Sequence, residues 1–103
     1  MKLAAWLASR EPPPPPVLAT RLQSLAHESD ADVGVEEALV VASGHVLRRL
    51  LRDGQTSRDS ALELLAADAL ATYAFEAAGD RPAELDARCT WAMRYYSALA
   101  DSA

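Results

Sequence analysis

Apolar side chains recur every three or four residues along most of this 103-residue chain, which is the spacing of one face of an α-helix. The pattern predicts a shorter helix over about 16–28 and three long helices over about 33–52, 57–78 and 82–99. No segment alternates apolar and polar residues as a half-buried strand does, and no repeat is found. We therefore expect an all-α fold, a small antiparallel helical bundle of three long helices plus a shorter one.

Capping signals mark where these helices start and stop. Asp32 is a candidate cap for the third helix, and Thr56 and Asp59 have capping-box spacing at the start of the fourth. Gly54 and Gly79 are suited to end the third and fourth helices. The connections that remain are short, and short connections favour antiparallel neighbours.

The N-terminal segment 1–9 is predicted to be a short amphipathic helical arm, separated by residues 10–16 from a helical-bundle domain at 17–103. Two helical turns are not stable alone, so Trp6 must dock on the body of the protein or on a partner. The five consecutive prolines of the separating segment favour an extended polyproline II conformation. That segment is either a stiff spacer, which we favour, or a ligand for an SH3-like or WW-like groove.

The fourth helix is apolar on two sides, which predicts a central position with protein along both flanks. One flank contains Leu62, Leu65, Ala66, Ala69 and Tyr73, and the other contains Leu64, Ala67, Ala71, Phe75 and Ala78. Only a narrow ridge of Asp68, Thr72 and Glu76 is polar. Within the third helix, Gly44 predicts a place where another helix comes close.

Composition and charge argue against several classes of function, among them nucleic-acid binding and membrane insertion. The chain is 50% hydrophobic and 24% charged, as expected of a globular domain, and its net charge of −5 is unfavourable for contact with nucleic-acid phosphates. No apolar run is long enough for membrane insertion, and Leu3–Ala8 is too short for a signal peptide, so we expect a cytoplasmic protein. The single cysteine, Cys89, allows neither an internal disulfide nor a cysteine-based zinc cluster.

The stretch LLAADALATYAFEAAG at 64–79 resembles an alanine-rich helix of the polyprenyl diphosphate synthases, with Asp68 as its lone acid. The resemblance implies a close-packed central helix. The chain has no adjacent pair of aspartates, whereas those enzymes hold Mg²⁺ and diphosphate with DDxxD motifs. We interpret the likeness as shared packing and expect no prenyl transfer.

One polar cluster is a candidate ligand site. His45, Arg48, Arg49 and Arg52 fall on the polar face of the third helix, and guanidinium groups bind oxyanions through two parallel hydrogen bonds. Cations also belong near a helix C-terminus for electrostatic reasons alone. The four glycines are isolated, and no Glu-x-x-His pair occurs, so we expect no cofactor, no metal and no catalysis.

The apolar surplus predicts an interface. A bundle this small has difficulty covering two flanks of the fourth helix and both tryptophans, and exposed aromatic patches usually mark contacts. The interface candidates are Trp6, Trp91 and Tyr95. We expect the chain to associate with itself as a homodimer or with an unidentified protein partner, the alternative being a monomer that covers these residues itself.

Overall fold

A computed structural model describes residues 2–28, 33–54 and 57–102. Within these residues the chain forms α-helices and no strand, which confirms the predicted all-α bundle. The helices are α1 (Leu3–Ala8), α2 (Pro16–Glu28), α3 (Val35–Asp53), α4 (Arg58–Ala78) and α5 (Leu85–Ser102), with a 3₁₀ turn, η1, at Pro82–Glu84. None of the helices in the described ranges is both long and apolar enough to cross a membrane.

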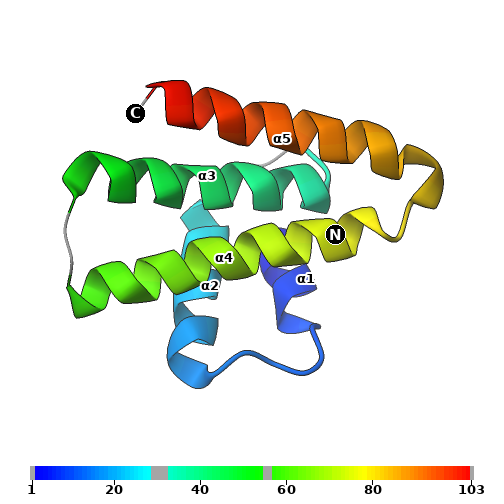
Figure 1. Cartoon of the computed structure of the whole chain (residues 1–103). Coiled ribbons are helices and arrows are strands. Elements are labelled where there is room, and N and C mark those ends of the chain that lie inside the picture. The colour runs from blue at the N-terminus through cyan, green and yellow to red at the C-terminus, as the bar shows by residue number, and fades with distance from the viewer. Residues whose placement is uncertain (1, 29–32, 55–56, 103) are drawn as a thin grey trace.

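The three long helices run alongside one another, and each is antiparallel to the next along the chain (Figure 1). Helix α3 lies between α4 and α5 in this view, and its contact with α4 is the most extensive helix pair in the molecule. The two shorter helices, α1 and α2, pack beside each other and cross the long helices instead of aligning with them.

Local chemistry explains where the helices begin and end. Gly54 ends α3 with a left-handed backbone (φ 60°), and its N–H donates to the Leu50 carbonyl at 3.0 Å, as predicted for a glycine cap. At the start of α4, the Ser57 hydroxyl accepts from the Ser60 N–H at 3.2 Å. Gly79 ends α4 as predicted, and its N–H donates to the Phe75 carbonyl at 3.1 Å. The predicted caps Asp32 and Thr56 lie outside the described residues.

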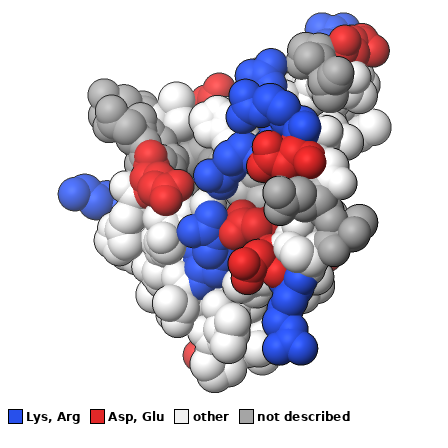
Figure 2. Space-filling model, turned by 90° about the vertical axis from the view of Figure 1, so that its left-hand side faces the viewer, with Lys and Arg blue, Asp and Glu red and all other residues white. Residues whose placement is uncertain are grey.

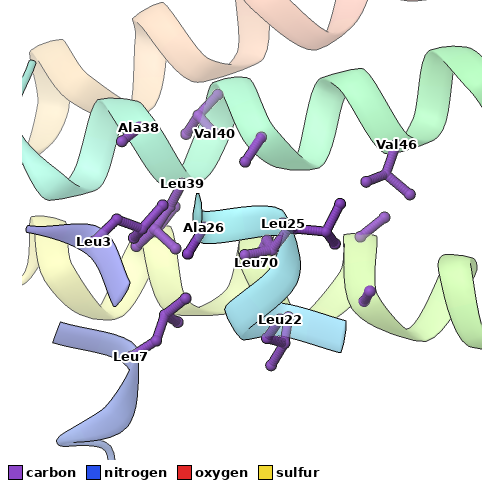
Figure 3. Packing of buried hydrophobic residues seen from close by; sticks show 14 of the residues in the cluster. Leu3, Leu7, Leu22, Leu25, Ala26, Ala38, Leu39, Val40, Val46 and Leu70 are labelled. Atoms are coloured by element: carbon purple, nitrogen blue, oxygen red, sulfur yellow. The ribbon is translucent and has the colours of Figure 1, made fainter. Parts of the chain in front are cut away.

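The core is formed where α1 and α2 pack against α3 and α4 (Figure 3). Leu39 of α3 and Leu70 of α4 are completely buried at its centre, and Leu22 and Leu25 of α2 are buried beside them. Each fully buried leucine contributes roughly 1.5–3 kcal/mol through removal of its surface from water. The arm is tied to this core by a hydrogen bond from Gln23 Nε2 to the Ala4 carbonyl at 2.9 Å.

At Gly44, side chains of α5 pack directly against the backbone of α3. A methyl group placed on Gly44 would lie 2.8 Å from Leu99 Cδ1 and would overlap the Tyr95 ring. The prediction that a helix comes close to Gly44 is therefore confirmed, and the helix is α5.

The prediction that α4 is covered along both flanks is correct for its inner residues and wrong for three of its large side chains. On one flank Ala66 is buried and Ala69 and Tyr73 are half-buried, and on the other flank Ala67 and Ala78 are buried. Leu64, Leu65 and Phe75 are instead 56%, 57% and 46% exposed. Helix α3 lies between α4 and α5 (Figure 1), and α5 approaches α4 near Phe75 and Ala78, so part of the outer side of α4 is left uncovered.

Candidate interaction surfaces

The predicted anion-binding side chains lie together on one exposed side of α3. His45, Arg48, Arg49 and Arg52 are all exposed there. At the end of the molecule where α3 ends and α4 begins, Figure 2 shows Lys and Arg side chains lying among Asp and Glu side chains. The cluster is thus accessible to a ligand, but its surroundings are of mixed charge.

A shallow groove of about 240 Å³ adjoins this cluster and has the same mixed character. Its polar lining includes Arg21, Arg49, Asp53, Asp59 and Glu63. Arg21 Nε donates to Glu63 Oε1 at 2.5 Å, and this hydrogen bond raises the pKa of Arg21 above its usual value. Because carboxylates outnumber guanidinium groups and one arginine is already paired, the groove itself is poorly suited to an anion.

Trp6 is buried within the chain and is not presented to a partner. Its ring is 7% exposed and meets Tyr73 of α4 edge-to-face, with the ring centroids 5.9 Å apart. The Arg10 guanidinium lies over the Trp6 ring, 3.8 Å from its centroid, and donates to Glu76 at 3.0 Å. Of the two possibilities raised for Trp6, the structure places it on the body of the protein.

Trp91 and Tyr95 form a half-buried aromatic pair along one side of α5. Their rings stack with centroids 5.6 Å apart and an angle of 25° between the planes. The Arg88 guanidinium lies 4.8 Å from the Trp91 centroid, and Nε of Arg88 donates to both carboxylate oxygens of Glu36 at 2.5 and 2.8 Å. The hydrogen bond to Glu36 raises the pKa of Arg88, so α5 is held to α3 by an ion pair beside the aromatic pair.

Sequence reasoning missed the outer side of α4 as a surface. The large exposed apolar side chains on the long helices are Leu51 of α3, Leu64, Leu65 and Phe75 of α4, and Leu85 and Met93 of α5. On a wheel of about 100° per residue, Leu65 projects between Thr72 and Glu76 of the polar ridge. That placement was the signal in the sequence that Leu65 faces outward with the ridge.

A larger hollow of about 860 Å³ lies at the opposite end, where α3 begins and α4 ends. Its polar lining is Glu36, Glu37, Asp80, Arg81, Glu84 and Arg88. Two of its ion pairs are internal, Arg88 with Glu36 and Arg81 with Glu84 at 3.5 Å. The hollow therefore has an acidic excess, without a histidine or cysteine in its lining that could act as nucleophile or base.

Among the described residues, no group of three or more histidine, cysteine, aspartate or glutamate side chains is arranged to hold a metal ion. Cys89 is a half-buried free thiol on α5.

Comparison of the chain with protein-family models, with curated proteins and with solved structures finds no match in any of the three.

Proposed function

We propose that this protein works through protein contacts, as a homodimer or as an accessory subunit of a larger assembly, and that it is not an enzyme. The observation that supports this proposal is the set of large apolar side chains left in water on the two outer long helices. Leu64, Leu65 and Phe75 of α4 and Met93 of α5 are between 46% and 62% exposed. Scattered single apolar residues are normal on a protein surface, but several on one helix are typical of an interaction site.

The aromatic pair of α5 is a second contact candidate within the same proposal. Trp91 and Tyr95 are half-buried, and aromatic side chains with one covered and one open edge are enriched at interfaces. Trp6 is no longer part of the proposed contact, since it is buried in the core.

Light scattering on the full chain tests the proposal. Self-association predicts a molar mass near twice the 11.0 kDa of the chain, whereas an accessory subunit studied without its partner should bind a hydrophobic dye such as ANS while folded. Trp91→Asp is expected to lower the mass if the aromatic pair of α5 is the contact. A chain that stays at 11.0 kDa up to high concentration and binds no dye contradicts the proposal.

Anion binding at α3 is the alternative function, supported by the exposure of His45, Arg48, Arg49 and Arg52 on one side of that helix. Phosphate or diphosphate should then raise the melting temperature, and the rise should vanish when Arg48 and Arg49 are both changed to alanine. Unchanged melting curves with both anions would exclude this function.

The proposal also covers the kind of partner and the location of the protein. With a net charge of −5, we propose protein rather than nucleic-acid partners. We also propose a cytoplasmic location, where a lone thiol such as Cys89 remains reduced.

A further inference from the structure

One exposed side of α4 has residues at the spacing of a two-stranded coiled coil, and two of them, Leu65 and Phe75, are large and apolar. Six exposed positions follow one another at alternating intervals of four and three residues, which is the spacing of heptad positions a and d. They are Ala61, Leu65, Asp68, Thr72, Phe75 and Gly79, and we call them the α4 seam. Leu65 and Phe75 of the α4 seam are 57% and 46% exposed, so a second helix packed on the seam would bury both.

The α4 seam is complementary to itself when a second copy lies antiparallel. With the two-fold axis at the level of Leu70, Leu65 faces Phe75 of the second copy, so each large apolar residue meets another. Asp68 faces Thr72 of the second copy in the next layer, and Ala61 faces Gly79 at the ends. Each layer then pairs two large apolar residues, two polar residues or two small residues. This self-complementarity favours a second copy of the chain as the partner of α4.

Charge selects the antiparallel arrangement over the parallel one. Arg58 begins α4 and Asp80 follows its last turn, and both are exposed. Antiparallel packing brings Arg58 near Asp80 of the second copy and opposes the two helix dipoles. Parallel packing would instead place Asp68 beside the same aspartate of the second copy, with mutual repulsion of the two carboxylates.

The rest of the molecule leaves room for this partner. Helices α1 and α2 lie across the side of α4 away from the viewer in Figure 1, and α5 approaches the α4 seam at Phe75, which is still 46% exposed. The Asp68–Thr72 layer is polar, so it lowers the affinity of the α4 seam for a second copy compared with an apolar layer. We therefore propose that the protein forms an antiparallel homodimer through the α4 seam, an inference that rests on the proposed function and names its partner as a second copy of the chain.

Molar mass of the full chain, measured from about 10 µM to about 1 mM, is the first test, because weak interfaces are populated in that range. Leu65→Asp and Phe75→Asp should each return the mass to 11.0 kDa. The matched control is Leu51→Asp on α3, because Leu51 and Leu65 are both 57% exposed, and it should leave the dimer intact. Circular dichroism checks that each variant keeps its helices.

Cysteine cross-linking tests the register independently of stability. In a Cys89→Ser background, Leu65→Cys and Phe75→Cys are made as separate proteins and oxidised alone or mixed. In the antiparallel dimer the two copies of residue 65 are about 15 Å apart along the axis, so each variant alone stays uncrosslinked and only the mixture forms a disulfide dimer. Cross-linking of each variant alone would overturn the antiparallel arrangement.

The outcomes separate this inference from the broader proposal. A dimer that survives Leu65→Asp and Phe75→Asp but is lost in Trp91→Asp overturns the α4 seam and keeps the proposed function. A mass of 11.0 kDa at every concentration, with no disulfide in the mixture, overturns the homodimer altogether.

Discussion

The Tyr95 ring of α5 rests directly on the backbone of Gly44 in α3, because a glycine at that position removes the side chain that would separate the two helices. Gly44→Ala is therefore expected to destabilise the fold. Overpacking costs about 1–3 kcal/mol, which exceeds the roughly 1 kcal/mol that alanine gains over glycine in helix propensity. Urea unfolding followed by circular dichroism measures the difference.

The Gly44→Ala cost has an internal control. Tyr95→Ala removes the ring that the new methyl group would overlap, so the cost of Gly44→Ala should fall sharply in that background. Equal costs with and without Tyr95 would show that the ring is not the cause.

A second contact between the same helices is polar. Ser43 is completely buried, and its hydroxyl bonds to the Tyr96 hydroxyl while also donating to the Val40 carbonyl at 3.1 Å. Tyr96→Phe should cost about 0.5–1.5 kcal/mol, since one buried hydrogen bond is lost without a large change in volume. The control is Tyr73→Phe, which removes the hydroxyl of another aromatic ring, one that packs edge-to-face with Trp6.

Alkaline pH should weaken this region. Burial raises the pKa of Tyr95 and of Tyr96 above the ordinary value of about 10. Arg48 partly opposes the rise for Tyr95, and the hydrogen bond with Ser43 partly opposes it for Tyr96. The unfolded chain then loses these protons first, so stability is complete below about pH 10 and falls as the pH rises through the folded-state values. Unfolding free energy measured between about pH 8 and pH 11 should decline less steeply in Tyr96→Phe than in the unaltered chain; an identical decline would contradict the assignment to Tyr96.

Much of this fold is predictable because local signals and packing agree. Gly54 is predicted to cap α3 and does so with a positive φ, and Gly44 predicts the close approach of another helix, which the structure shows to be α5. Periodicity failed for Leu64 and Phe75, because a helical wheel gives the direction of a side chain but not which neighbouring helix reaches it. Here α3 lies between α4 and α5, so Leu64 is left exposed and Phe75, which lies beside α5, is only partly covered.

The candidate surfaces also include positions that the sequence predicts and positions that depend on long-range packing. Exposure of His45 and its neighbouring arginines follows from their polar face and is confirmed. The position of Trp6 depends on how the short arm docks against Tyr73, which is far away in the sequence. It also depends on Arg10, whose guanidinium covers the Trp6 ring. Long-range docking of this kind leaves no periodic signal.

The ion pair between Arg88 and Glu36 should contribute measurably to holding α5 on α3. Its side chains are only 31% and 18% exposed, and one guanidinium nitrogen reaches both carboxylate oxygens. A double-mutant cycle with Arg88→Ala and Glu36→Ala is expected to give a coupling of up to about 1 kcal/mol that shrinks as salt is added. The Arg81–Glu84 pair is the matched control, because its side chains are 73% and 57% exposed and its coupling should be close to zero. Equal couplings for the two pairs would mean that burial beside Trp91 adds nothing to the Arg88–Glu36 interaction.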